Sequence, residues 1–226
     1  MRYFGTAPWP SDETKYSQQT DADDIAAFIR SLNSGPVDLV GWSYSGPIVL
    51  LVALQHPELV HSLAIHEPGS LTYVTDAVIA KIAGEDRGAA LGPAVAAVKA
   101  GDFARAARLT PIGVNHQPDF WETTTPEVRT MFLDNARTWR LALAAPPQPA
   151  ITCDQLHQIT MPVLITVGGD RRPYFHIAAE GAASCIPAAQ FLTVPGRHLE
   201  SFSSPRRSMR RCCNSLQRRV HDRSPD

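Results

Sequence analysis

A sharp turn between an apolar strand and an apolar helix constrains this chain more than any other feature of its sequence. Residues 37–40 read as a short buried strand, and residues 47–55 are apolar on every side, as in a buried helix. The segment 41–46, Gly-Trp-Ser-Tyr-Ser-Gly, must therefore turn the chain within a few residues. Such a turn holds its middle residue, Ser43, in strained backbone geometry and leaves room only for small residues two positions away on either side. Those two positions hold glycine and serine, so the sequence allows the turn.

Strands and helices alternate along the rest of the chain. The apolar periodicity predicts further strands over 61–66, 161–167 and 190–194, and helices over 21–32 and 173–184. Alternation of this kind predicts an α/β fold with a mostly parallel sheet and helices on both faces. Residues 70–157 are rich in alanine and in helical patterns, so we expect a helical insertion between the second and third of these strands.

Composition is that of an ordinary globular protein. The 226 residues are 44% hydrophobic and 19% charged, which predicts one large domain, or one domain with an insertion. The longest apolar stretch is far shorter than a membrane-spanning helix requires, so no transmembrane segment is expected. The N-terminus has no apolar signal core, and we therefore expect a cytoplasmic protein.

The charge is unevenly distributed along the chain. Residues 203–226 hold seven arginines and two aspartates, whereas the preceding body has an acidic balance and gives no case for nucleic-acid binding. Apolar residues in this basic C-terminal tail have helical spacing. Three interpretations stay open: a helix closing the fold, a basic surface helix that binds anionic lipid or nucleic acid, and a terminus foreign to the body.

The four cysteines do not form a recognisable pattern. Cys153 and Cys185 are isolated, and Cys212 and Cys213 are adjacent, with no C-x-x-C spacing among them. This arrangement is typical neither of a disulfide framework nor of a zinc site, so we expect neither.

Three residues with complementary chemistry follow predicted strands. Serine is a weak nucleophile until a base takes its proton, and the usual base is a histidine held by a carboxylate. Ser43 follows the first strand, Asp170 follows the strand over 161–167, and His198 follows the last strand. Since parallel strands end at the same edge of a sheet, we expect these side chains to converge there. Glu67, which follows the second strand, is the alternative acid.

The order of these motifs resembles the α/β-hydrolase superfamily, in its serine esterase branch. The resemblance covers roughly residues 1–202 and is carried by three segments, 37–46, 161–170 and 194–199. The motif is usually written G-x-S-x-G, and serine replaces its last glycine in this sequence.

The resemblance implies the role of each residue. Ser43 would be the nucleophile, His198 the general base, Asp170 the carboxylate that orients the histidine, and the backbone N–H of Tyr44 one donor to the oxyanion. It further implies a carboxylesterase-like enzyme that cleaves a small ester or related acyl substrate through an acyl-serine intermediate. No metal or organic cofactor is expected.

The resemblance also indicates what this sequence lacks. The family sheet has eight strands, and the chain supplies only the last four, so we expect a truncated form of the fold. No His-Gly or Gly-Gly loop precedes Ser43, although the family takes its second oxyanion donor from such a loop. The activity is therefore expected to be impaired. The alternative is a catalytically weak fragment that acts as a non-enzymatic interaction module.

These expectations divide the chain into three parts. Residues 1–69 and 158–202 form the core, 70–157 a helical lid, and 203–226 the basic tail. The strand over 37–40 would lie at an exposed edge of the sheet, which is a template for pairing with another chain. We therefore expect poor solubility, or a homo-oligomer in which a second copy covers this edge.

Overall fold

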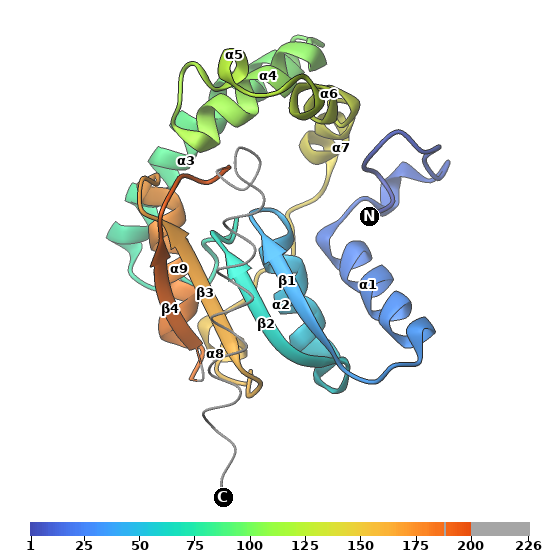
Figure 1. Cartoon of the computed structure of the whole chain (residues 1–226), viewed down its shortest axis with the longest axis vertical. Coiled ribbons are helices and arrows are strands. Elements are labelled where there is room, and N and C mark those ends of the chain that lie inside the picture. The colour runs from blue at the N-terminus through green and yellow to red at the C-terminus, as the bar shows by residue number, and fades with distance from the viewer. Residues whose placement is uncertain (188, 200–226) are drawn as a thin grey trace, which may run out of the picture.

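A four-stranded parallel sheet forms the centre of the protein (Figure 1). The computed structural model describes residues 1–187 and 189–199. The strands are β1 (Val37–Trp42), β2 (Val60–His66), β3 (Val163–Gly168) and β4 (Ala189–Val194). They lie in the order β1-β2-β3-β4, so each strand pairs with the next one along the chain. The predicted α/β fold with a parallel sheet is confirmed. The basic tail over 203–226 lies outside the described residues.

Helices precede the first strand and fill the connections between the strands. The first part of the chain forms η1 (Glu13–Lys15), α1 (Gln18–Leu32), α2 (Ser45–Gln55) and η2 (Pro57–Leu59). The connection between β2 and β3 forms α3 (Ala77–Lys99), α4 (Phe103–Asn115), α5 (Phe120–Thr123), α6 (Pro126–Asp134), α7 (Thr138–Ala144) and α8 (Cys153–Leu156). The last described helix is α9 (Pro173–Cys185).

The main hydrophobic core lies between the sheet and the helices behind it in Figure 1. Leu63 and Ile65 of β2 and Ile165 of β3 are fully buried in this core against α2 and α9. They face the same side of the sheet because strand geometry turns successive side chains to opposite faces. The intervening residues of β3 are buried as well. Of the described helices, α2 and α9 contact the sheet directly, and both pack on this one face. We expected helices on both faces of the sheet, and α2 and α9 provide them on this face.

Helix α1 begins earlier than the sequence suggests. The sequence favours Thr20 as the N-cap of a helix from residue 21, but Ser17 provides it, because its hydroxyl accepts a hydrogen bond from the N–H of Thr20 at 3.0 Å. Helical periodicity places Ile25, Phe28, Ile29 and Leu32 on one apolar stripe. Ile29 is buried, but Phe28 is 63% exposed and Leu32 is 48% exposed. The stripe is therefore only partly covered within the described residues.

Strand β1 is the edge of the sheet, as predicted. Its residue Val40 is 73% exposed. The neighbouring Trp42 has its backbone groups occupied, because the Ser45 hydroxyl accepts from its N–H at 2.8 Å and donates to its C=O at 2.9 Å. Ser45, which replaces the last glycine of the turn, thus provides hydrogen-bond partners for the backbone N–H and C=O of Trp42 at the edge of the sheet.

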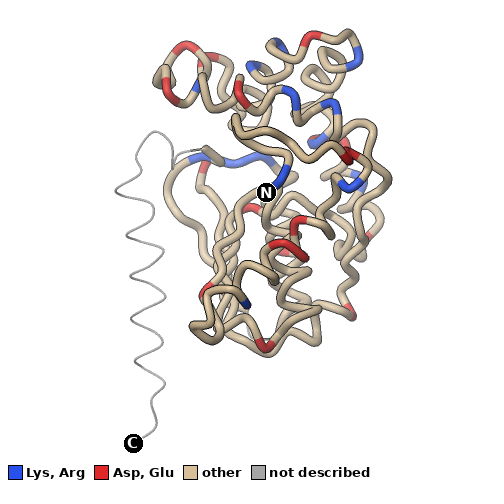
Figure 2. Tube along the Cα trace, turned by 90° about the vertical axis from the view of Figure 1, so that its right-hand side faces the viewer, with Lys and Arg blue, Asp and Glu red and all other residues tan. Residues whose placement is uncertain are grey.

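The helices α3 to α7 lie beyond the carboxyl ends of the strands (Figure 1). They contact the N-terminal segment, since the Thr138 hydroxyl donates to the carbonyl of Tyr3 at 2.6 Å. Basic and acidic residues are interspersed over the described chain (Figure 2). None of the helices in the described ranges is both long and apolar enough to cross a membrane.

One expectation about the cysteines is wrong. Cys153, at the start of α8, forms a disulfide with Cys185, at the end of α9, across 32 positions of sequence. Both helices lie behind the sheet, and their packing brings the two side chains together although no sequence motif links them. Cys212 and Cys213 lie outside the described residues.

Candidate active site

The turn after β1 holds Ser43 in a strained conformation. Its φ of 51° is in the left-handed region, which a residue with a side chain rarely adopts. Small neighbours make the turn possible: a Cβ added at Gly41 would lie 2.5 Å from a methyl of Val49 and 3.1 Å from the Cα of Gly46. The strand, turn and helix predicted from the sequence therefore place the Ser43 side chain where β1 ends and α2 begins.

A second strained residue follows the next strand. Glu67, immediately after β2, has a φ of 46° and a fully buried side chain. One of its carboxylate oxygens, Oε2, lies 2.5 Å from Nδ1 of His198, and the other accepts a hydrogen bond from the N–H of Gly168 at 2.7 Å. An ionised carboxylate accepts hydrogen bonds only, so Nδ1 of the histidine carries the proton and Nε2 is free to accept one.

The environment of Glu67 keeps this carboxyl group ionised. Burial by itself would raise the pKa of Glu67, because it disfavours the charged form. The hydrogen bond from His198 and the electrostatic interaction with its ring, with smaller contributions from His66 and Gly168, outweigh that effect and lower the pKa of Glu67 below its ordinary value. Glu67 is thus a buried anion compensated by the groups around it.

Asp170 does not occupy the position expected of it. Its side chain is 68% exposed and accepts a hydrogen bond from Nε of Arg197 at 2.6 Å. The backbone after β3 is bonded to the loop after β4, since the N–H of Asp170 donates to the carbonyl of Gly196 at 3.1 Å. The expectation that Asp170 orients His198 is therefore corrected: Glu67, the alternative acid, makes that contact.

Sequence order could not separate the two acids, because both follow strands that end at the same edge of the sheet. The arginine next to the histidine could have distinguished the two acids. Arg197 precedes His198 directly and offers Asp170 a partner on the surface, which leaves Glu67 to the buried histidine.

Aromatic rings hold the imidazole of His198 in place. The Phe175 ring stacks on it with centroids 3.9 Å apart and planes 11° apart, and the His66 ring lies nearly parallel at 6.4 Å. His66 itself contacts the Thr166 hydroxyl through Nδ1 at 2.9 Å, and burial lowers its pKa. The strand order predicts that His66 is the histidine nearest to the site, apart from His198, but no motif gives it a role, and none marks Phe175.

Ser43 and His198 lie near each other, but their side chains are not hydrogen-bonded within the described residues. The Trp42 ring, next to Ser43 in sequence, lies 5.8 Å from the His198 ring between centroids. The N–H of Ser43 bonds to the carbonyl of His66, next to Glu67, at 3.0 Å. Within the described residues, however, no hydrogen bond links the Ser43 hydroxyl to His198. Such contacts are often loose without substrate and tighten when it binds.

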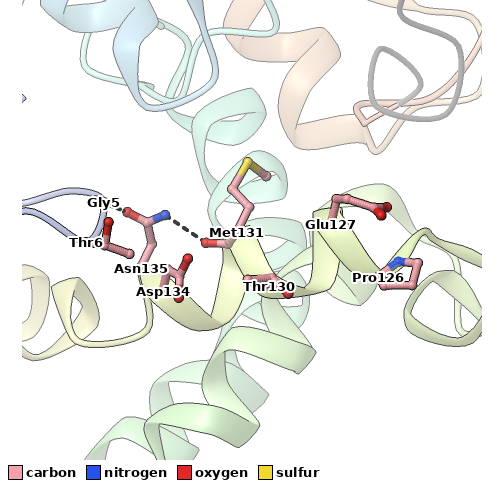
Figure 3. A pocket seen from close by; sticks show the side chains of 8 residues that line it. All are labelled: Gly5, Thr6, Pro126, Glu127, Thr130, Met131, Asp134 and Asn135. Atoms are coloured by element: carbon pink, nitrogen blue, oxygen red, sulfur yellow. Dashed lines mark hydrogen bonds between the residues drawn. The ribbon is translucent and has the colours of Figure 1, made fainter.

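A cleft lined by none of Ser43, Glu67 and His198 lies between the N-terminal segment and α6 (Figure 3). Its volume is about 470 Å³, and Gly5, Thr6, Glu127, Met131 and Asn135 are among its lining residues. The Asn135 side chain accepts from the N–H of Gly5 and donates to the carbonyl of Met131, both at 2.7 Å. The cleft thus marks where the helical insertion meets the start of the chain.

These features together define a protein of the α/β class with a strained serine turn and a buried histidine–carboxylate pair at the carboxyl edge of its sheet. The sequence profile of the alpha/beta hydrolase fold family matches residues 1–164. The chain therefore belongs to the α/β-hydrolase fold family.

Solved structures with the same fold include enzymes of several activities. A thermophilic esterase from Thermogutta terrifontis is 19% identical with a TM-score of 0.68, over 96% of this chain and 78% of that one. Est816, an N-acyl homoserine lactone degrading enzyme, is 20% identical with a TM-score of 0.67, over 96% and 79%. MenH from S. aureus is 15% identical with a TM-score of 0.69, over 96% and 79%. Likeness at this identity shows the fold alone.

Proposed function

We propose that the protein is a serine hydrolase that cleaves a small ester or a related acyl compound through an acyl-Ser43 intermediate. The observation that carries this proposal is the buried hydrogen bond between His198 and Glu67, at the edge of the sheet where the strained Ser43 turn lies. Strained serine turns and buried histidine–carboxylate pairs both have a free-energy cost, and both recur where acyl transfer is catalysed. The esterase among the structural neighbours supports the same class of reaction.

The proposed reaction has two steps. In the first, Oγ of Ser43 attacks the acyl carbon while its proton moves to Nε2 of His198, and the leaving alcohol then departs with that proton. In the second, His198 takes a proton from water, the hydroxide forms a bond to the acyl carbon, and the ester bond to Ser43 breaks as the proton returns to Oγ. Throughout both steps Glu67 accepts a hydrogen bond from Nδ1–H of His198 and stabilises the imidazolium. No metal or organic cofactor takes part.

The negative charge of each tetrahedral intermediate would be stabilised by the backbone N–H of Tyr44. This N–H lies at the start of the 11-residue helix α2, whose positive end favours an anion. The sequence has no His-Gly or Gly-Gly loop before Ser43 to supply a second donor. Loss of one oxyanion donor typically costs about 10²–10³ in turnover, which sets the scale of what the Tyr44 N–H would contribute.

The helical insertion over 70–157 is proposed to be the lid of the site. Its helices α3 to α7 lie beyond the strand ends where Ser43, Glu67 and His198 gather (Figure 1). A substrate held between the insertion and the core would be shielded from bulk water, which strengthens the electrostatic contacts of the site.

A second candidate is a catalytically weak interaction module with the same fold. The missing hydrogen bond between the Ser43 hydroxyl and His198 within the described residues favours this candidate, because an unpaired serine is a poor nucleophile.

Hydrolysis of a short-chain chromogenic ester separates the two candidates. We expect the wild-type protein to turn over the ester and the Ser43→Ala variant to retain only background hydrolysis. Ser31→Ala, which removes an exposed hydroxyl of α1, is the matched control and should behave as wild type. Wild-type turnover equal to that of Ser43→Ala would favour the interaction module.

A further inference from the structure

The loop directly after β2 holds the backbone of Ser43 from both sides. At one end of the loop, the carbonyl of His66 accepts from the N–H of Ser43 at 3.0 Å. At the other end, the N–H of Gly69 donates to the carbonyl of Ser43 at 2.9 Å. Glu67, which binds His198, lies between these two residues in sequence. One short loop therefore contacts the proposed base and clamps the proposed nucleophile.

The clamp fixes the direction of a second group as well. The peptide bond between Ser43 and Tyr44 is planar and trans, so the N–H of Tyr44 points opposite to the carbonyl of Ser43. That carbonyl accepts two hydrogen bonds, from Gly69 at 2.9 Å and from Gly46 at 3.1 Å. Whatever holds this carbonyl therefore also aims the Tyr44 N–H, which is the proposed oxyanion donor.

The close approach favours a glycine at position 69. A Cβ added there would lie 3.2 Å from the carbonyl oxygen of Ser43, 3.4 Å from its carbonyl carbon and 3.6 Å from the nitrogen of Tyr44. These are backbone atoms, which cannot rotate away as the end of a side chain can. A methyl group would therefore displace the loop and the Ser43–Tyr44 peptide from each other by a few tenths of an ångström.

We propose that Gly69 is a positioning residue that sets the orientation of the oxyanion donor by clamping the Ser43–Tyr44 peptide. This inference rests on the proposed hydrolase function of Ser43. It deepens that proposal because it places the acid and the control of the oxyanion donor on the same loop. Gly69 lies two residues beyond Glu67, so a local displacement at Gly69 acts directly on the Ser43–Tyr44 peptide and reaches the His198–Glu67 pair only through Pro68.

The test compares Gly69→Ala with Gly84→Ala. Gly84 lies in α3 and has no atom within 4 Å of an added Cβ, so it controls for the glycine-to-alanine change itself. Active sites are counted by titration of Ser43 with a fluorophosphonate, and kcat is expressed per titrated site, which removes any unfolded fraction from the comparison. Affinity for a short-chain alkyl boronic acid, which forms a tetrahedral adduct with the serine, reports on the oxyanion donor separately from KM.

We expect Gly69→Ala to lower kcat about tenfold to a hundredfold and to weaken boronic acid binding by a similar factor, with KM changed less than threefold. Gly84→Ala should match wild type. A role in folding alone would reduce the number of titrated sites but leave kcat per site and boronic acid affinity at wild-type values, which would overturn the inference. Failure of the wild-type protein to react with the fluorophosphonate would overturn the hydrolase proposal and this inference with it.

Discussion

The Glu67 carboxylate lies 2.5 Å from Nδ1 of His198, with Glu67 fully buried and the His198 side chain 3% exposed. This pair is the most desolvated charged contact near Ser43. Removing one partner of such a pair leaves the other buried without compensation, so the two side chains are expected to act as a unit.

Glu67→Gln should lower kcat for ester hydrolysis by about 10³–10⁴, because the amide cannot hold the imidazole in the required tautomer. Asp170→Asn should change kcat less than threefold, since that side chain is exposed and bonded to Arg197. Steady-state kinetics of both variants check this prediction. A large loss of kcat with Asp170→Asn and none with Glu67→Gln would contradict this prediction and identify Asp170 as the carboxylate that orients His198.

Asp21 gives the stability an unusual pH dependence. Its side chain is buried, with the Tyr44 hydroxyl 3.5 Å away, and burial raises its pKa to about 6 despite the nearby Arg2 and N-terminal amine. The folded protein therefore holds this proton more tightly than the unfolded chain, and its stability falls as the pH rises through about 6.

Between pH 5 and pH 8 the wild-type protein should lose about 1–2 kcal/mol of unfolding free energy relative to Asp21→Asn, which cannot ionise at this position. Urea unfolding of both proteins at the two pH values measures the difference. Parallel pH profiles would show that Asp21 ionises normally in the folded state.

The disulfide between Cys153 and Cys185 should stabilise the fold. It closes a loop of 32 residues between α8 and α9, for which chain entropy predicts about 3–4 kcal/mol. Dithiothreitol should lower the melting temperature of wild type but not that of a variant with alanine at both positions. If alkylation and peptide mapping of the unreduced protein found both thiols free, that result would contradict the disulfide. Such bonds are rare in reducing compartments, so this measurement also bears on the predicted cytoplasmic location.

The exposed edge of the sheet leads to a prediction about assembly. Val40 of β1 is 73% exposed, and no strand of the described residues pairs with the outer side of β1, so this edge can pair with the same strand of a second copy. We predict that wild type self-associates and that Val40→Lys shifts it towards monomer in light scattering coupled to gel filtration. Val78→Lys, which alters an equally exposed valine of α3, is the control and should not change the assembly. A wild-type protein that is monomeric at all concentrations would contradict this prediction.

The sequence was most informative where one local pattern determined the structure. The turn around Ser43 was predictable because strand, small residues and buried helix are contiguous. The choice of Glu67 over Asp170 was not, because it depends on which way two loops turn after their strands. The disulfide and the stacking of Phe175 on His198 depend likewise on packing between distant segments.

The exposure of Phe28 and Leu32 shows the same limit. Helical periodicity predicts that such residues share one face of a helix, but it does not reveal how much of that face another element covers. Only the packing of α1 on α2 shows that Ile29 is buried while its two neighbours on the stripe are not.

The central claim is that Ser43 is a nucleophile activated by His198. Its most direct test is the rate at which a fluorophosphonate modifies the protein, with the adduct located by peptide mass spectrometry in wild type and in His198→Ala. The account predicts a single adduct on Ser43 in wild type and modification slowed by at least about a hundredfold in the variant. An unmodified Ser43 in wild type, or equal rates in both proteins, would contradict it.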